Sequence, residues 1–383
     1  MKTQTCTAMH DFFSKSLHLK KLIIVFLILA VQTVNAQYAL NTSLFDLLTG
    51  EEIKEVTLRT DLVNLLNSTE QSAAYQPATF SFSAQQGGNQ TWDVKVKPRG
   101  KFRRQVCEFP PLKLNFSKTA LFNRGLAEHD KLKLVTHCTE DKNLGNEKVM
   151  QEYLAYKLYQ ELNPYSFRVQ LVNIQYLDAS GRLNGFRRLG FIIEDTSELE
   201  QRMNAEECEE CTYQPVAAFD TKATGMHAMF QYLIGNSDYS VPVLRNVKLI
   251  RRAIDGKLVP VGYDFDFAGF VDAPYAIPAN HLGQITIRQR IYLGTLASDQ
   301  EMQEIIEIFL SKKEQLLKII QDFRPLSSAK RYELKEYLLT YYEQMEMIKA
   351  NGYHNVYQHL RQEHPLAVPD GGSAADYGVV ARN

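Results

Sequence analysis

Four oxygen-bearing side chains in the second half of the sequence have types and spacings suited to phosphate and metal chemistry. Asp238 follows a predicted helix, Asn246 lies eight residues later, and Asp264 and Asp266 come just after an apolar strand at 258–261. Carboxylate and amide oxygens are the ligands that a hard cation such as Mg²⁺ prefers, and loop carboxylates beside buried strands are costly unless they bind something. Asp264 and Asp266 are two residues apart, so in a strand they would share one face. Asp238 could accept a proton from an attacking hydroxyl group.

The first half of the chain supplies a candidate phosphate-binding lysine. Lys113 lies in an alternating strand at 111–116 and is expected to point away from the apolar face of that strand. A helix predicted over 147–162 carries Glu147 and Glu152, and either carboxylate could hold this lysine in place. The order of a base, a metal-binding amide and a metal-binding carboxylate is also the order found in kinases.

These segments together resemble the CotH family of secreted, atypical protein kinases from spore coats, which is distantly similar to HipA-type kinases. The resemblance covers about residues 90–275. Its most specific parts are the Asp238…Asn246 pair and the run Tyr263-Asp-Phe-Asp-Phe-Ala-Gly269. The other matching segments are 97–104, 111–114, 152–158 and 189–194.

The resemblance implies a role for each matching side chain. Asp238 would be the catalytic base, and Asn246 and Asp264 would be metal ligands. Asp266 would be the second acid of the family's Asp-x-Asp motif, counted with the metal ligands. The implied nucleotide-binding residues are Lys113 on the phosphates, its partner Glu152, Arg99 and Glu194. The implied cofactors are Mg²⁺ or Mn²⁺ and ATP, and the implied partner is an exported protein substrate or an envelope protein.

Other interpretations of the same residues remain open. A non-catalytic envelope binding or scaffold protein would need neither nucleotide nor metal. A glycoside hydrolase would use two of Asp238, Asp264 and Asp266, with the carboxyl groups about 5–5.5 or 6.5–9.5 Å apart. Asp264 and Asp266 could instead form a structural turn or a Ca²⁺ site. Lys113 could be an ordinary strand lysine, and the basic run 99–104 could be a solvated hairpin tip.

Hydrophobic periodicity predicts the elements that position these residues. The expected strands form a hairpin within 78–97, single strands at 111–116 and 131–136, a second hairpin at 167–176 and 189–193, and short strands at 247–250 and 258–261. The expected helices lie near 61–66 and at 147–162, 220–235 and 299–361, the last broken near Pro325, and residues 195–215 are expected to form an acidic loop.

This order predicts an α+β protein with a two-lobed, protein-kinase-like fold. The expected β-rich N-terminal lobe spans residues 37–193 and includes one helix. The expected C-terminal lobe spans 194–363 and is mainly helical. A signal peptide at 1–36 and a disordered tail at 364–383 are expected at the two ends.

The predicted leader places the protein outside the cytoplasm, secreted or periplasmic. Lys20 and Lys21 precede an apolar run at 22–31, and a small-residue cleavage site ends at Ala36. The run is shorter than the roughly 20 residues that a membrane-spanning helix needs, so an integral membrane protein is not expected. The formal net charge of −1 offers no basic excess for binding nucleic acid.

Four cysteines follow the predicted leader, which suits disulfides in an oxidising compartment. Cys107 and Cys138 flank the same predicted sheet and could pair. Cys208-x-x-Cys211 favours a local disulfide, because no second pair with zinc-ligand spacing occurs in the sequence.

Overall fold

A computed structural model describes residues 42–50, 53–67, 74–84, 88–295 and 297–361. The predicted signal peptide and the predicted C-terminal tail lie outside the described residues. Among the described residues, no helix is both long and apolar enough to cross a membrane.

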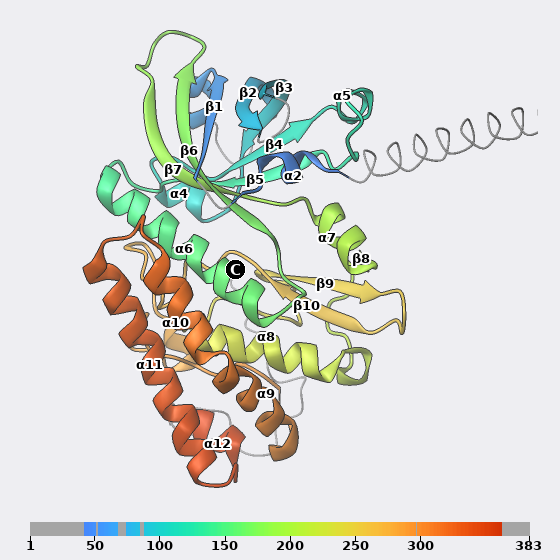
Figure 1. Cartoon of the computed structure of the whole chain (residues 1–383), viewed down its shortest axis with the longest axis vertical. Helices are drawn as coiled ribbons and strands as arrows, with labels where there is room; N and C mark the ends of the chain where they lie inside the picture. The colour runs from blue at the N-terminus through green and yellow to red at the C-terminus, as the bar shows by residue number, and fades with distance from the viewer. Residues whose placement is uncertain (1–41, 51–52, 68–73, 85–87, 296, 362–383) are drawn as a thin grey trace, which may run out of the picture.

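The N-terminal part of the chain forms a closed β-barrel (Figure 1). Its strands run in the spatial order β1-β2-β3-β4-β5-β7-β6. Strand β6 is parallel to β1, and the other neighbouring pairs are antiparallel. The strands are β1 (Lys54–Thr60), β2 (Gln76–Ala84), β3 (Gly88–Pro98), β4 (Leu112–Phe116), β5 (Lys131–Val135), β6 (Val169–Asp178) and β7 (Phe186–Ile193).

Alternation along the strands separates the inside of the barrel from the outside. In β4, Leu112, Leu114 and Phe116 are buried in the barrel core, while the residues between them face outward. At Gly190 of β7 the surrounding barrel has no room for a side chain. An added Cβ would come within 2.7 Å of the Val135 carbonyl oxygen and 2.6 Å of Ile174.

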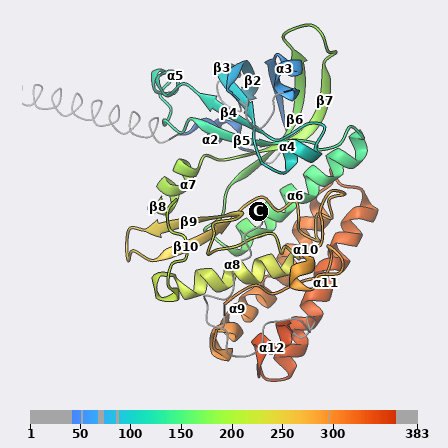
Figure 2. The same ribbon diagram turned by 180° about the vertical axis from the view of Figure 1, so that it is seen from behind.

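The second part of the chain combines helices with a small antiparallel sheet. The sheet consists of β8 (Ala205–Glu207), β9 (Val247–Arg252) and β10 (Leu258–Gly262), in the order β10-β9-β8. In Figure 2 this sheet lies between α7 and α8. The longer helices are α6 (Lys142–Leu162), α7 (Thr196–Met203), α8 (Thr221–Leu233), α9 (Asp299–Ser311), α10 (Lys313–Asp322) and α11 (Ser328–Ala350). The shorter ones are α2 (Leu44–Leu48), α3 (Leu62–Leu66), α4 (Arg103–Val106), α5 (Lys118–Asn123) and α12 (Val356–Arg361).

Helix α6 joins the barrel to the rest of the molecule (Figure 1). It begins where Asp141 accepts hydrogen bonds from the backbone N–H groups of Asn143 and Leu144, and Pro164 follows its end. Its buried residues share one hydrophobic core with Val135 and Phe191, which point out of the barrel, and with helices α8 to α11. The barrel wall under α6 is therefore apolar on both faces.

The expected two-lobed, kinase-like α+β fold is wrong. The strands of the first part close into a barrel of mixed direction, and the second part contains a three-stranded sheet besides its helices. The protein is therefore a mixed α/β structure built on a closed barrel. The physical reason is β1, which the sequence analysis did not identify as a strand and which closes the barrel by pairing with both β2 and β6.

Most of the individual elements were predicted correctly. Both barrel hairpins, β4, β5, α6, α8 and the β9–β10 hairpin are present near the expected residues. The expected loop at 195–215 is wrong in part, because it contains α7 and β8. The C-terminal helical segment is interrupted at Lys312 as well as near Pro325. Both cysteine pairs form disulfides, Cys107–Cys138 and Cys208–Cys211.

Candidate functional site

Arg103 lies at the centre of a buried ionic cluster where the barrel meets the helical part. Its guanidinium contacts Glu152 of α6 at 3.1 Å and Asp266 at 2.8 Å, and it also pairs with Asp264. Arg103 is the first residue of α4, in the connection between β3 and β4, while both aspartates follow β10. Three distant segments of the chain therefore meet at one cation.

The charges in this cluster are not balanced. Burial is the largest influence on the pKa of Arg103 and lowers it, but Asp264, Asp266 and Glu152 together raise it well above its usual value. Burial also raises the pKa values of Glu152 and Asp266, and Arg103 only partly opposes this. Three carboxyl groups share one guanidinium, so the cluster favours an additional proton or cation.

Asp264 is the member of the cluster that reaches toward solvent. Its side chain is 28% exposed, against 4% for Glu152 and for Asp266. Its backbone N–H donates to the Tyr156 hydroxyl at 2.8 Å. Asp264 also has a positive φ of 63°, a conformation that is costly for a non-glycine residue and is frequent at functional sites. Asp264 is therefore the carboxylate best placed to meet a ligand.

Asp238 and Asn246 lie together, as the sequence predicted. The Asn246 amide donates to the Asp238 carboxylate at 3.0 Å and to the Asp238 carbonyl at 2.7 Å. Arg245 approaches the other carboxylate oxygen of Asp238 at 3.4 Å. The Asn246 carbonyl accepts the backbone N–H of Tyr263 at 3.1 Å, which brings this pair next to Asp264. Asn246 also has a positive φ, of 52°.

The turn before Asp238 depends on a glycine at the end of α8. Gly235 has φ +65°, and a Cβ there would lie 2.1 Å from the Tyr337 hydroxyl oxygen. Ser237 is held from the other side, because its hydroxyl donates to Gln284 at 3.0 Å. Asp238 is thus presented from a well-supported turn.

Asp264 and Asp266 do not share a strand face as expected. Strand β10 ends at Gly262, so both residues lie in the loop that follows. They are brought together by Arg103 instead. Asp266 binds the guanidinium from a buried position, and of the two aspartates only Asp264 reaches toward solvent. The carboxylate oxygens of Glu152, Asp264 and Asp266 lie within 4.8 Å of one another, around a position that Arg103 already neutralises in part.

Lys113 and Glu152 do not form the expected pair. Lys113 points out of the barrel, as predicted, but it lies between Lys97 of β3 and Lys133 of β5. Glu152 binds Arg103, because α4 carries that arginine toward α6 while Lys113 stays on the strand face. Arg103 was mentioned in the sequence analysis only as part of a basic run.

Lys133 is a site residue that the sequence analysis missed. Its ammonium group lies 4.7 Å from the centre of the Phe167 ring and 5.5 Å from that of Tyr263. Burial, followed by the charges of Arg99 and Lys248, lowers the pKa of Lys133 to about 7. Both lysines stand in the pattern Leu-Lys-Leu, so alternation alone could not distinguish Lys133 from Lys113.

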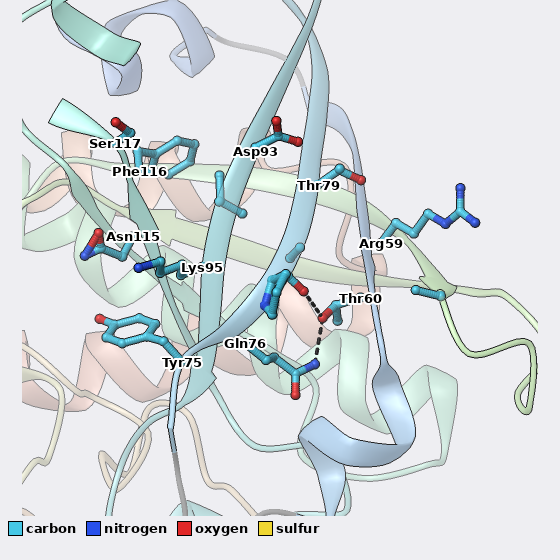
Figure 3. Close-up of a pocket in the computed structure, with 14 residues that line it drawn as sticks. Arg59, Thr60, Tyr75, Gln76, Thr79, Asp93, Lys95, Asn115, Phe116 and Ser117 are labelled. Carbon is cyan, nitrogen blue, oxygen red and sulfur yellow. Dashed lines mark hydrogen bonds between the residues drawn. The ribbon is translucent and has the colours of Figure 1, made fainter. Parts of the chain in front are cut away.

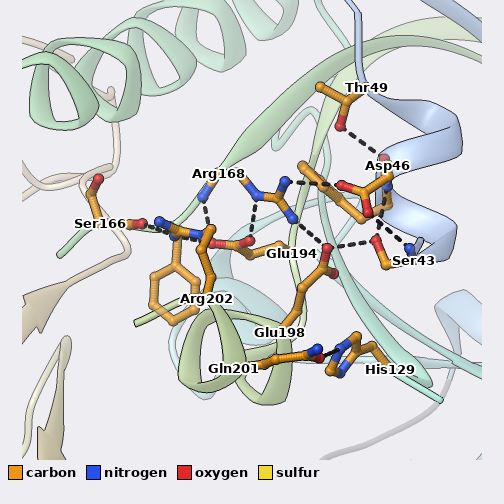
Figure 4. A network of polar contacts seen from close by, with 12 residues as sticks. Ser43, Asp46, Thr49, His129, Ser166, Arg168, Glu194, Glu198, Gln201 and Arg202 are labelled. Carbon is orange, nitrogen blue, oxygen red and sulfur yellow. Dashed lines mark hydrogen bonds and ion pairs between the residues drawn. The ribbon is translucent and has the colours of Figure 1, made fainter. Parts of the chain in front are cut away.

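Arg99 and Glu194 have different surroundings. Burial is the main cause that lowers the pKa of Lys113 and of Lys133, and the charge of Arg99 lowers both further, so Arg99 belongs to the same cationic group. The carboxylate of Glu194 is instead bound by Arg168 and Arg202, each at 2.7 Å. Glu194 therefore belongs to a separate ionic network (Figure 4), and its predicted place in the nucleotide site is not supported by these contacts.

Comparison with known proteins gives no family. The chain matches no protein-family model, and no curated protein matches it significantly. The resemblance to the CotH family stays a prediction from short motifs.

Proposed function

We propose that this protein is an exported phosphotransferase that uses a metal-bound nucleotide and a protein hydroxyl group as the acceptor. The observation that carries the proposal is the arrangement around Tyr263. A lysine ammonium lies over its ring, its N–H is bonded to Asn246, and the next residue is the partly exposed Asp264. Tyr263 therefore lies beside a lysine that could bind phosphate oxygens and beside Asn246 and Asp264, whose oxygens could bind a metal ion.

The residues fit a divalent cation of the Mg²⁺ or Mn²⁺ type. Asp264 offers a carboxylate oxygen beyond the one that pairs with Arg103, and Asn246 keeps its side-chain oxygen because its NH₂ group is the donor to Asp238. Such a cation would neutralise charge on the transferred phosphoryl group. Arg103 would hold Asp264 in position through their ion pair.

In this proposal each side chain has one task. Asp238 accepts the proton of the attacking hydroxyl while the oxygen–phosphorus bond forms and the bond to the leaving diphosphate breaks. Asn246 orients Asp238 through its two hydrogen bonds. Lys133, whose ammonium group lies 5.5 Å from the centre of the Tyr263 ring, takes the phosphate-binding role that was expected of Lys113. The leader-like segment at 1–36 supports an exported protein as acceptor.

The first experiment measures thermal unfolding of the purified protein with and without ATP and Mg²⁺. A ligand at 100 times its Kd stabilises the folded state by about 2.7 kcal/mol, which is several degrees for a chain of this length. We expect this shift in the wild type and its loss in Asp264→Asn. Asp266→Asn is the matched control, because it also removes a partner of Arg103 but leaves the exposed carboxylate in place.

A shift that survives in Asp266→Asn and disappears in Asp264→Asn would support the metal–nucleotide site. Transfer of the terminal phosphate to added protein, lost in Asp238→Asn, would then support catalysis. No shift with any nucleotide or divalent cation would overturn the proposal and favour a non-catalytic binding protein.

A further inference from the structure

Three lysines form a straight row across the outer face of the barrel. Lys97 of β3, Lys113 of β4 and Lys133 of β5 are directly paired in the strand registers. Their neighbours Val96, Leu114 and Leu132 fill the barrel core, so the three ammonium-bearing side chains share the opposite face. Adjacent strands are about 4.8 Å apart, so the row extends over roughly 10 Å.

No carboxylate in the described part of the chain forms an ion pair with this row. Lys97, Lys113 and Lys133 and the nearby Arg99 have no carboxylate oxygen within 4.0 Å among the described residues, whereas Lys131 on the same face pairs with Asp130 at 3.4 Å. Like charges directly opposite each other on neighbouring strands are destabilising. A row of this kind is consistent with an anionic ligand.

The nearest acidic candidate is engaged elsewhere. Asp195 acts through its charge on both Lys113 and Lys133, but its carboxylate accepts the backbone N–H groups of Lys131 at 2.8 Å and Ser197 at 3.2 Å. The contacts of the row are instead with the Thr196 hydroxyl, to which the Lys133 ammonium donates at 3.4 Å, and with aromatic rings. Tyr75 lies 4.7 Å from the Lys97 ammonium, and Phe167 lies 4.7 Å from that of Lys133.

We infer that the lysine row, Lys97, Lys113 and Lys133, binds a linear oligophosphate chain laid across strands β3, β4 and β5. One end of the chain would lie at Lys133, beside Tyr263 and the proposed metal ligands, so the inference rests on the proposed function and extends it. The other end would reach Lys97 and Tyr75. A linear chain of phosphates matches a linear row of ammonium groups, and a single phosphate would contact only part of it.

The far end of the row opens into a hollow on the barrel surface. The hollow has a volume of about 830 Å³ and is lined by polar side chains that include Tyr75, Lys95 and Asn115 (Figure 3). This volume lies within the range of small-molecule sites. The same oligophosphate chemistry occurs in a nucleoside triphosphate and in inorganic polyphosphate. Only the nucleoside would place a base against Tyr75.

The test is calorimetric titration of the protein without divalent cations at fixed ionic strength. The probes are sodium tripolyphosphate, ATP and orthophosphate. We expect tripolyphosphate to bind at least tenfold more tightly than orthophosphate. Lys97→Gln and Lys113→Gln should each weaken tripolyphosphate by roughly tenfold or more, because each removes a charge-assisted hydrogen bond. Lys318→Gln, which removes a lysine of α10 that pairs with Asp322 outside the barrel, should change affinity little.

The Tyr75→Leu variant distinguishes between a nucleoside triphosphate and inorganic polyphosphate as the ligand. Weaker ATP binding with unchanged tripolyphosphate binding would assign the hollow to a nucleoside, while no effect on either would favour inorganic polyphosphate. Both results support the row as the binding site. Equal affinity for orthophosphate and tripolyphosphate, or wild-type tripolyphosphate affinity in both lysine variants, would overturn the inference.

The test also distinguishes this inference from the proposed function. Asp264→Asn should keep metal-free tripolyphosphate binding, because Asp264 is not part of the row. Tripolyphosphate binding without any Mg²⁺-dependent transfer would support the row and overturn the phosphotransferase. A Mg²⁺-dependent thermal shift with ATP that is unchanged in Lys97→Gln and Lys113→Gln would support the phosphotransferase and overturn the lysine row as the binding site.

Discussion

Two arginines in this protein each bind three carboxylates, but in different surroundings. Arg103 is 6% exposed and pairs with Glu152, Asp264 and Asp266. Arg168, at the start of the segment that leads into β6, is 31% exposed and pairs with Asp46, Glu194 and Glu198. The first cluster joins a barrel loop to the helical part, and the second joins α2 to the α7 region (Figure 4).

The two clusters differ most in how many cations share their carboxylates. In the Arg168 cluster a second arginine, Arg202, binds Glu194, and the Ser43 hydroxyl donates to Glu198 at 2.5 Å. In the Arg103 cluster no second arginine or lysine pairs with the three carboxylates among the described residues. Arg168 therefore belongs to a structural clamp with several supporting contacts, while the Arg103 cluster has one cation for three carboxyl groups, one of which is partly exposed. A deficit of this kind is suited to a bound cation.

Replacing each arginine with methionine tests this difference most directly. Arg103→Met would leave two buried carboxyl groups and the partly exposed Asp264 without a cation, which costs about 3–5 kcal/mol of unfolding free energy. Arg168→Met would cost less, about 1–2 kcal/mol, because Arg202 still binds Glu194 and part of the site is exposed to water. Urea unfolding at pH 7 measures both values. Equal losses in the two variants would contradict the comparison.

The disulfides give a second comparison, because one of them directly follows the helix that carries Arg103. Helix α4 begins at Arg103 and ends at Val106, and the next residue, Cys107, is bonded to Cys138 just before α6. This bond closes a sequence separation of 31 residues, against 3 for Cys208–Cys211. Chain entropy predicts a loss of about 3–4 kcal/mol for the Cys107→Ala, Cys138→Ala double variant and about 2 kcal/mol for the Cys208→Ala, Cys211→Ala control.

Urea unfolding under non-reducing conditions compares these two double variants. A larger loss from the Cys208–Cys211 pair would contradict the prediction. If the first disulfide also positions Arg103, then Arg103→Met should destabilise the double variant by less than it destabilises the wild type, since the two sites would be coupled.

The sequence predicted the strands of the barrel better than their arrangement. Alternation in β2, β3, β4 and β5 is clear, and each of these strands is present. Strand β1 reads Lys-Glu-Val-Thr-Leu-Arg-Thr, with only two large apolar residues, and it was not recognised. Its pairing with β6 joins segments more than 100 residues apart. Local patterns cannot report such a contact, so the closure of the barrel was missed.

The candidate site was predicted in part for a similar reason. Asp238, Asn246 and Asp264 are close in sequence and are brought together by short turns. The cation partners come from distant strands and from α4, where position depends on tertiary packing. Alternation correctly placed Lys113 outside the barrel, but it could not indicate that Lys133 lies nearer to Tyr263 or that Arg103 takes Glu152.

Glu198 of the Arg168 cluster gives the prediction with the smallest effect. Burial, the largest influence, raises the pKa of Glu198 to about 7, while Ser43 and Arg168 lower it and Glu194 and Asp46 raise it. Between about pH 4.5 and pH 7 the folded protein therefore binds a proton at Glu198 that the unfolded chain releases. The contribution of this group to stability is largest below pH 4.5 and falls by roughly 2–3 kcal/mol as the pH rises to 7.

The measurement is the unfolding free energy of the wild type and of Glu198→Gln from pH 4.5 to pH 7.5. Glutamine keeps an oxygen that can accept from Ser43 and Arg168 but cannot titrate, so the difference between the two proteins isolates this group. We expect the stability of the variant relative to the wild type to increase across this range. A constant difference would mean that Arg168 keeps Glu198 ionised throughout, and the two arginine clusters would then be more alike in charge than their exposures indicate.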